Sequence, residues 1–236
     1  MTTSSCPASR VFVSLTTVPP RLARTGALLE VLASLHSQNP SPEAVILHVP
    51  QRYERWPNAT FVVPAELLTL PWLRISRPLS DEGPAAKVLG LRLAGHHGEW
   101  DPGNIFIEDA RQDDIVIFTD DDNVKRPGWL AGLTSALQPG SAVAYRSHPL
   151  DERSPAGGIV MGYLGFGWHL GTVDLSDLQH FRWLQAGECD RVDDHMLTAY
   201  LHMRQVGLLP ILCACAIIPL SPVLPRTSSY GDPSFA

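Results

Sequence analysis

Residues 115–123 read IVIFTDDDN and join a short apolar run to three consecutive carboxylates. A continuous apolar run of this length predicts a strand that is buried on both faces of a sheet. The strand is expected to end near Thr119, which leaves Asp120, Asp121 and Asp122 where the backbone leaves the sheet. Because open α/β sheets bind ligands at the carboxyl ends of their strands, the stretch predicts both a fold class and a site.

The three adjacent carboxylates repel one another, and burying them without a counter-charge is costly. A hard divalent cation with oxygen ligands removes that cost and is the expected partner. The alternative is a solvated acidic turn that binds nothing. The buried strand that leads directly into the aspartates favours the metal over this alternative.

Apolar patterns on both sides of this stretch predict an α/β chain in which strands alternate with helices. Strands are predicted at residues 10–17, 44–49, 73–76 and 141–145, and helices at 22–36, at 127–137 and from 193 onward. The Val-Pro-Pro-Arg segment at residues 18–21 is expected to break the chain between the first strand and the first helix. One domain is expected over residues 1–236, with 1–9 and 222–236 flexible.

The Gly-Pro pair at residues 83–84 predicts a helix start, because proline lacks only an N–H that would be unpaired there. An apolar pattern follows as far as Leu93, and Lys87 falls in the first turn. The positive end of a helix attracts anions. Two interpretations of Lys87 stay open: a lysine that faces a phosphate, and a solvated lysine on an ordinary helix start.

Residues 147–171 are rich in glycine and aromatic residues and contain the run GGIVMGYLGFGWHLG. The run has no G-x-G-x-x-G motif between a strand and a helix, which argues against a dinucleotide-binding turn. Its composition predicts an irregular sheet edge that lines a cleft. Trp168 would stack on a sugar in such a cleft, although burial in the core is the commoner outcome for a tryptophan.

Asp193 and Asp194 open the last predicted helix and follow Glu188 and Asp190. Acidic residues near a helix N-terminus are expected as caps, which accounts for one of the pair. Together they form a second acidic centre and a candidate for general-base chemistry. Adjacent helical residues point about 100° apart, so only one faces a cleft easily. Asp194 is favoured as the base and Asp193 as the cap.

The overall composition excludes some classes of protein. A formal charge of −6 without any basic run argues against a nucleic-acid partner. The N-terminal sequence MTTSSCPASR lacks the apolar core of a signal peptide. The longest apolar run, residues 208–220, is shorter than the roughly 20 residues that span a bilayer. We therefore expect a cytoplasmic protein without a transmembrane segment, whose association with membranes comes only through the molecules that it binds.

The cysteines predict neither a disulfide framework nor a zinc site. Their spacing contains no C-x-x-C pair. The four are expected to be reduced and mostly buried thiols. They are Cys6, Cys189, Cys213 and Cys215.

The order of these pieces resembles the GT-A glycosyltransferases, enzymes that use nucleotide sugars and have a Rossmann-like mixed sheet flanked by helices. The resemblance runs from VFVSLTTVPPRL through GPAAK and FTDDDNV to ECDRVDDHMLTAYL. A group of small family members shares the SLTT opening followed by proline and the GPA-x-K helix start. The resemblance implies transfer of a sugar from a UDP- or GDP-sugar to a hydroxyl of a glycan, lipid or protein-linked acceptor.

The same resemblance implies roles for the aspartate cluster. Asp120 and Asp122 would form the D-x-D motif that binds Mn²⁺ or Mg²⁺, with Asp122 as a direct ligand. Asp120 would contact the ribose or a metal-bound water, and Asp121 the donor sugar. Many family members add a C-terminal metal ligand, often a histidine, whereas no histidine follows His202 here.

Further residues are assigned by the resemblance to the donor and the acceptor. Asp193 or Asp194 matches the general base of the inverting members. The remaining candidates are expected to bind the nucleotide. They are Thr16, Thr17, Arg21, Asp81 and Lys87.

Two other functions stay open. A haloacid-dehalogenase-like phosphatase would use the sequence DDDNV at residues 120–124 as its D-x-D-x-T/V motif and Asp193-Asp194 as its later acidic pair. That class needs a separate lysine between the two, and Lys125 lies too close to the motif. The third possibility is a catalytically silent module that binds sugar nucleotides.

Overall fold

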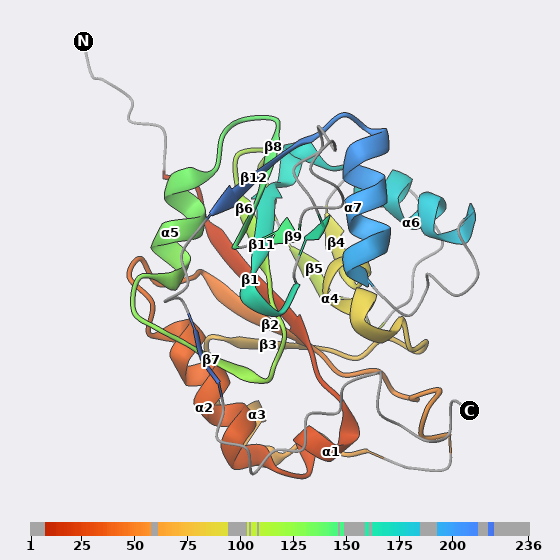
Figure 1. Cartoon of the computed structure of the whole chain (residues 1–236). Helices are drawn as coiled ribbons and strands as arrows, with labels where there is room; N and C mark the ends of the chain where they lie inside the picture. Colours follow the sequence, from red (N-terminus) through yellow and green to blue (C-terminus); the bar gives the residue numbers. More distant parts are fainter. Residues whose placement is uncertain are drawn as a thin grey trace.

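A computed structural model of the chain describes residues 8–57, 61–93, 103, 105–107, 109–145, 147–148, 159–160, 162–184, 193–211 and 217–219. Helices cover both faces of a central sheet in this part of the chain (Figure 1). The fold is therefore an α/β arrangement of three layers, as the alternation of strands and helices predicts.

The central sheet has seven strands in the order β12-β8-β11-β6-β1-β2-β3. Every neighbouring pair is parallel except the two pairs that β11 makes with β6 and β8. The sheet is thus mixed, with one antiparallel strand inside it. Its strands are β1 (Val11–Thr16), β2 (Ala44–His48), β3 (Leu73–Ser76), β6 (Ile115–Phe118), β8 (Ser141–Tyr145), β11 (Phe166–His169) and β12 (Gly207–Ile211).

In the described ranges, six short strands pair outside the central sheet. The first pair is parallel and the other two are antiparallel. They are β4 (Leu91–Leu93) with β5 (Ile105–Ile107), β7 (Asn123–Lys125) with β13 (Ile217–Pro219), and β9 (Ser147–His148) with β10 (Ile159–Val160).

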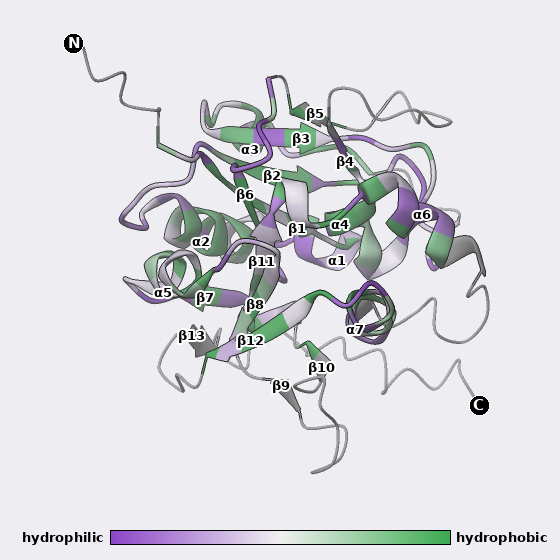
Figure 2. Ribbon diagram, turned by 90° about the horizontal axis from the view of Figure 1, so that it is seen from above, coloured by the Kyte–Doolittle hydropathy of each residue, from purple (hydrophilic) through white to green (hydrophobic). Residues whose placement is uncertain are grey.

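Each face of the sheet has its own hydrophobic core. Helices α2 (Thr25–His36) and α5 (Trp129–Ala136) pack on one face, and α4 (Ala86–Leu89), α6 (Leu175–Leu184) and α7 (Asp193–Met203) on the other. Figure 2 shows the strands between these two groups of helices. The short elements are α1 (Pro19–Leu22), α3 (Ala65–Leu68) and the 3₁₀ turns η1 (Gly83–Ala85), η2 (Gly162–Leu164) and η3 (Leu170–Thr172).

The side chains of β1 alternate between the two cores, because successive residues of a strand point to opposite faces. Phe12 belongs to the core beneath α4, α6 and α7, whereas Val13 belongs to the core beneath α2 and α5. In β6, Val116 and Ile117 divide in the same way. Both strands are therefore buried on both faces, which confirms the expectation drawn from the apolar run that precedes the aspartates.

Most predicted elements are present, but three helix predictions need correction. The segment at residues 18–21 does not only break the chain: Pro19 opens the short helix α1, since proline suits a first helical turn. The helix after Gly83-Pro84 ends at Leu89, and the apolar pattern continues as β4. The helix predicted at residues 127–137 is shorter at both ends, because Gly128 adopts a φ of 84° before Trp129.

The prediction of an irregular sheet edge at residues 147–171 is wrong for β11 (Phe166–His169). β11 lies inside the sheet, between β6 and β8. Trp168 is buried in the core and contacts Phe118 and Phe166, so it is not placed to stack on a sugar. Gly167 is needed here, since a Cβ would lie 2.2 Å from the Val116 carbonyl oxygen.

None of the helices in the described ranges is long and apolar enough to cross a bilayer. The cysteines, Glu188 and Asp190 lie outside the described residues, as do most of the two terminal segments that are expected to be flexible.

Candidate functional site

The aspartate cluster, residues 120–122, lies where β6 ends beside β1. β6 ends at Phe118, and the Thr119 backbone N–H donates to the Ser14 carbonyl over 3.1 Å. β1 and β6 are parallel neighbours, so their carboxyl ends share one edge of the sheet. The cluster therefore lies at the edge where α/β folds bind ligands.

Lys87 and Asp120 form an ion pair, with 2.6 Å between Nζ and Oδ1. The Lys87 side chain is only 1% exposed, whereas that of Asp120 is 35% exposed. Burial by itself raises the pKa of Asp120. The neighbouring Lys87 ammonium acts in the opposite direction, and the pKa of Asp120 is lowered on balance. The interpretation of Lys87 as a solvated lysine is therefore wrong, because the short α4 turns it inward to the cluster.

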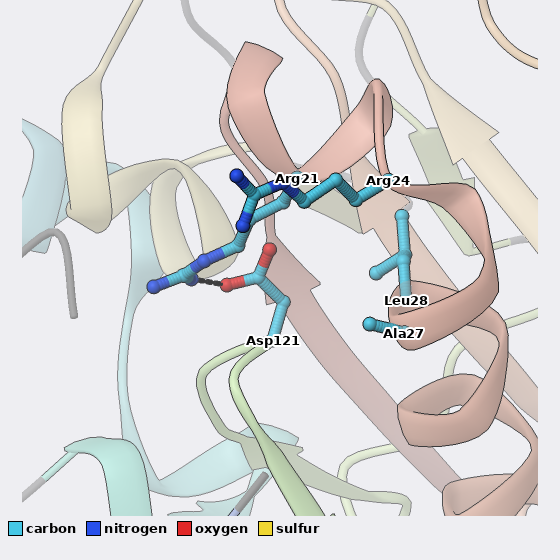
Figure 3. Close-up of a pocket in the computed structure, with 5 residues that line it drawn as sticks. All are labelled: Arg21, Arg24, Ala27, Leu28 and Asp121. Carbon is cyan, nitrogen blue, oxygen red and sulfur yellow. Dashed lines mark hydrogen bonds and ion pairs between the residues drawn. The ribbon is translucent and has the colours of Figure 1, made fainter. Parts of the chain in front are cut away.

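Arg21 spans the other two carboxylates of the cluster. Its Nη1 pairs with Asp121 Oδ1, and its Nη2 lies 3.3 Å from Asp122 Oδ2. Figure 3 shows Arg21 and Arg24 reaching over the Asp121 carboxylate in a small recess. Asp121 Oδ2 is buried and accepts no hydrogen bond from the described residues. The cluster thus holds a buried carboxylate oxygen whose hydrogen-bonding capacity is unused.

Asp122 is held less tightly than its neighbours. The Asn123 amide donates to its Oδ1 over 2.6 Å, and its side chain is 37% exposed. Burial and the charge of Asp120 raise the pKa of Asp122, while Arg21 opposes that shift. The Asp122 carboxylate is therefore the member of the cluster that gains most from a further positive charge.

Lys125 is a second buried lysine beside the cluster. Its Nζ donates to the Tyr163 carbonyl over 3.1 Å and lies 5.5 Å from the centre of the Trp129 ring. Burial lowers the pKa of Lys125 to about 8, against the charges of Asp120 and Asp122, which raise it. Its ammonium thus adds positive charge to the cluster without bonding a carboxylate directly.

Asp194, from the second acidic centre, lies close to Lys87 and therefore to the aspartate cluster, and Gly162 lies between them. The Gly162 backbone N–H donates to Asp194 Oδ1 over 2.9 Å. A Cβ on Gly162 would lie 2.6 Å from Asp194 Oδ1 and 3.0 Å from Lys87 Nζ. Both charged groups therefore meet at this glycine, and Lys87 has Asp120 and Asp194 as near neighbours.

The turn that carries Gly162 is anchored to α5 and to the end of β7. Besides the bond from Lys125 to Tyr163, the Trp129 indole N–H donates to the Leu164 carbonyl over 2.7 Å. Gly165 closes the turn with a φ of 110°, a conformation that suits glycine. A Cβ there would lie 2.6 Å from the Trp129 ring. The position of Asp194 beside the cluster thus depends on a closely packed turn.

The chain was compared with known proteins. No family model and no curated protein matches it. The chemistry of the site therefore rests on the geometry described above and on the resemblance of its sequence motifs.

The other residues proposed to bind the nucleotide have described partners. Thr16 Oγ1 donates to the His48 carbonyl over 3.2 Å. Asp81 accepts backbone N–H groups of Glu54 and Gly83, at 3.0 and 2.9 Å, so it fixes the loop before η1. Neither set of contacts brings the side chain to the cluster.

Thr17 differs, because its Oγ1 is buried and has no hydrogen-bond partner among the described residues. Its carbonyl accepts a hydrogen bond from the Tyr53 hydroxyl over 3.0 Å. For Asp193, the first residue of α7, the side chain lies outside the described part, so its expected capping role stays a prediction.

The described residues fit a divalent metal only as a partial ligand set. Asp120 and Asp122 are both about one-third exposed, so each can offer an oxygen to an ion that also binds water. Mg²⁺ commonly uses one or two carboxylates together with substrate phosphates. No group of three or more His, Cys, Asp or Glu side chains in the described ranges is placed to hold a metal alone. Phosphate or water oxygens would have to complete the shell.

Two residues of this site, Lys125 and Gly162, belong to no motif. In the sequence, Lys125 enters only as a mismatch to the phosphatase pattern. One signal was available: the chain has only two lysines, Lys87 and Lys125, and both lie against the aspartate cluster. Gly162 lies in a run of glycines, and no local pattern distinguishes it from its neighbours.

Proposed function

We propose that this protein is a GT-A glycosyltransferase that moves a sugar from a UDP- or GDP-sugar to an acceptor hydroxyl. The observation that carries the proposal is the meeting of Lys87 and Asp194 at Gly162, with Asp120 bonded to the same Lys87 ammonium. It joins the D-x-D cluster and the second acidic centre, residues from distant parts of the chain, in one place. A mixed α/β sheet with the cluster at the end of a central strand is compatible with that fold.

In this proposal Asp120 and Asp122 hold Mn²⁺ or Mg²⁺ together with oxygens of the donor. When bound, the ion supplies electrostatic stabilisation of the diphosphate as it leaves. Arg21 and Lys87 add charge-assisted hydrogen bonds to the same group. These cations already lie against the cluster, so a diphosphate bound there meets preorganised donors.

Asp194 acts as the general base in an inverting transfer. The Gly162 N–H fixes the carboxylate, and the base accepts the proton of the attacking acceptor hydroxyl. The proposal thus divides the two acidic centres: the cluster serves the donor, and Asp194 serves the acceptor. Asp121 remains buried beneath the donor site, where Arg21 pairs with it.

The test is metal-dependent turnover of sugar nucleotides. We expect hydrolysis or transfer from a UDP- or GDP-sugar to stop in excess EDTA and to return with Mn²⁺. Asp122→Ala should be inactive yet folded, because it removes one charge from a repulsive cluster. Full activity in excess EDTA would exclude the metal. Hydrolysis of p-nitrophenyl phosphate without turnover of sugar nucleotides would favour the phosphatase. Binding of sugar nucleotides without turnover would favour the catalytically silent module.

A further inference from the structure

Ser14, in β1, links the two segments that carry the Lys87–Asp120 ion pair. Its hydroxyl donates to the Lys87 carbonyl oxygen over 2.5 Å. Its own carbonyl accepts the backbone N–H of Thr119, the residue before Asp120, over 3.1 Å. Carbonyl groups in the last turn of a helix depend on donors from outside that helix, and the Ser14 hydroxyl is such a donor for α4. One buried serine thus fixes both segments.

His48, in β2, orients the Ser14 hydroxyl. Its Nε2 lies 3.0 Å from Ser14 Oγ. A serine hydroxyl has one hydrogen, which here is directed to the Lys87 carbonyl, so His48 donates from Nε2. Burial lowers the pKa of His48 to about 3, which leaves the ring neutral and its Nδ1 without a hydrogen. A Cβ on Gly90 would lie 2.3 Å from this Nδ1, so the residue after α4 packs directly on the ring.

The Ser14–His48 pair is not built as a nucleophile with its general base. A nucleophilic serine passes its proton to the base, whereas the Ser14 proton lies in the bond to the Lys87 carbonyl. Both residues are also 0% exposed, so no substrate reaches them. Their hydrogen bonds lead to the Lys87 backbone instead.

We propose that Ser14 and His48 are positioning residues of the donor site, which hold Lys87 so that its ammonium points to Asp120. The 2.6 Å ion pair requires a Lys87 backbone that is fixed in relation to the end of β6, and Ser14 bonds both segments. Neither Ser14 nor His48 touches a ligand, and both act through Lys87. The inference rests on the proposed function, in which Lys87 bonds the diphosphate of the donor.

A double-mutant cycle tests whether Ser14 acts through Lys87. The affinity of the whole chain for UDP or GDP is measured by isothermal titration calorimetry with Mn²⁺ present. Lys87→Met should weaken binding by about 10- to 100-fold, the scale of a charge-assisted hydrogen bond. Ser14→Ala should weaken it by about 2- to 10-fold, the scale of a neutral hydrogen bond, and should cause no further loss in the Lys87→Met background.

Ser141→Ala is the matched control. The Ser141 hydroxyl is also buried and donates to a backbone carbonyl, that of Gln138, over 2.7 Å. Ser141 begins β8, which runs in the same direction as β6, so it lies at the edge of the sheet opposite the cluster. Its substitution should leave nucleotide affinity unchanged. His48→Leu should weaken binding, whereas His48→Gln keeps a side-chain N–H and should restore it. His48→Leu replaces Ser14→Ala in the cycle if the latter shows no cooperative thermal unfolding.

A second measurement does not depend on nucleotide binding. The chain has only two lysines, so reductive methylation followed by peptide mass spectrometry reports on each separately. Ser14→Ala should raise the methylation rate of Lys87 by about 2- to 10-fold, because the lost hydrogen bond holds the inward position. The rate at Lys125 should not change.

The outcomes separate this inference from the proposed function. Faster methylation of Lys87 alone, with an affinity loss that disappears in the Lys87→Met background, supports the inference. An unchanged rate at Lys87, equal acceleration at both lysines, an unchanged nucleotide affinity, or an affinity loss that persists in the Lys87→Met background overturns it, while the glycosyltransferase stands. If the wild type binds no nucleotide, the proposed function fails, and the methylation rates decide whether Ser14 positions Lys87.

Discussion

The two ends of β6 carry buried aspartates with arginine partners, but they are built differently. Asp114, just before the strand, is fully buried and accepts bonds from Arg10 and Arg111 through both backbone N–H groups and both guanidinium groups. Asp121, just after the strand, is almost as buried, yet one of its oxygens has no described partner. The same residue type is saturated at one end of the strand and left incomplete at the other.

The pKa shifts are mixed at the carboxyl end, where the pKa of Asp120 is lowered like that of Asp114 but the pKa of Asp122 is raised. Burial alone would raise the pKa of Asp114, but the bonds from Arg10 and Arg111 bring it from 3.8 to about 2. At the other end, burial and Asp120 raise the pKa of Asp122, and burial lowers that of Lys125 to about 8. Groups satisfied to this extent stabilise a fold, whereas incomplete ones concentrate at functional sites. We therefore propose that the amino end of β6 contributes stability and that the carboxyl end binds ligands.

The largest expected effect is on rate at the carboxyl end. Asp194→Asn keeps the shape of the side chain and removes its basicity, so turnover should fall by about 10²- to 10⁴-fold. Steady-state kinetics should show this loss while the dissociation constant for the nucleotide changes little. The neighbouring Asp193→Asn is the control and should cost stability more than rate. Loss of nucleotide binding in Asp194→Asn would move this residue to the donor site.

The next largest effect is on stability at the amino end. Asp114→Asn removes the charge of the buried carboxylate that pairs with both Arg10 and Arg111, which should lower the free energy of unfolding by about 3 kcal/mol. The folded pKa is depressed, so this stability is present above about pH 4 and is lost as the pH falls toward 2. Urea unfolding of the wild type and of Asp114→Asn should show that their difference in free energy of unfolding becomes smaller as the pH falls from 4 to 2. A difference that stays constant below pH 4 would contradict the assignment.

The smallest effect sharpens the comparison, because it makes the same substitution at the other end. Asp121→Asn should change the free energy of unfolding by less than about 1 kcal/mol. One oxygen has no described partner, the removed charge lies between Asp120 and Asp122, and Arg21 keeps its contact with Asp122. Urea unfolding at pH 7 is again the measurement. A loss as large as that of Asp114→Asn would mean that both ends are structural.

Much of the sheet could be predicted from the sequence, because local patterns determine buried strands. The alternating, β-branched pattern of β1 and the apolar runs of β2 and β6 predict the positions of these strands within two residues, and the predicted bounds of β3 match those of the structure in full. The central place of β11 could not be predicted. It depends on antiparallel pairing with β6 and β8, which are distant in sequence, and its glycines suggest an edge.

The site shows the same limit. The aspartate cluster and its position at a strand end follow from the sequence, because strand and carboxylates are adjacent. The ion pair of Lys87 with Asp120 and the approach of Asp194 at Gly162 bring together residues more than 30 positions apart. The 83–84 Gly-Pro pair indicates a helix but not its length of four residues, which determines where Lys87 points.

The central claim is that ligands bind at the carboxyl end of β6 and not at its amino end. Thermal unfolding with UDP, GDP and their sugars, each with and without Mn²⁺, tests it in wild type, Asp122→Ala and Asp113→Ala. Asp113 is the exposed aspartate at the amino end and serves as the control. A ligand at 100 times its dissociation constant stabilises by about 2.7 kcal/mol. We predict that a nucleotide with Mn²⁺ raises the unfolding temperature of wild type and of Asp113→Ala, and that Asp122→Ala shows no such increase. No shift with any nucleotide, or an equal shift in Asp122→Ala, would contradict the claim.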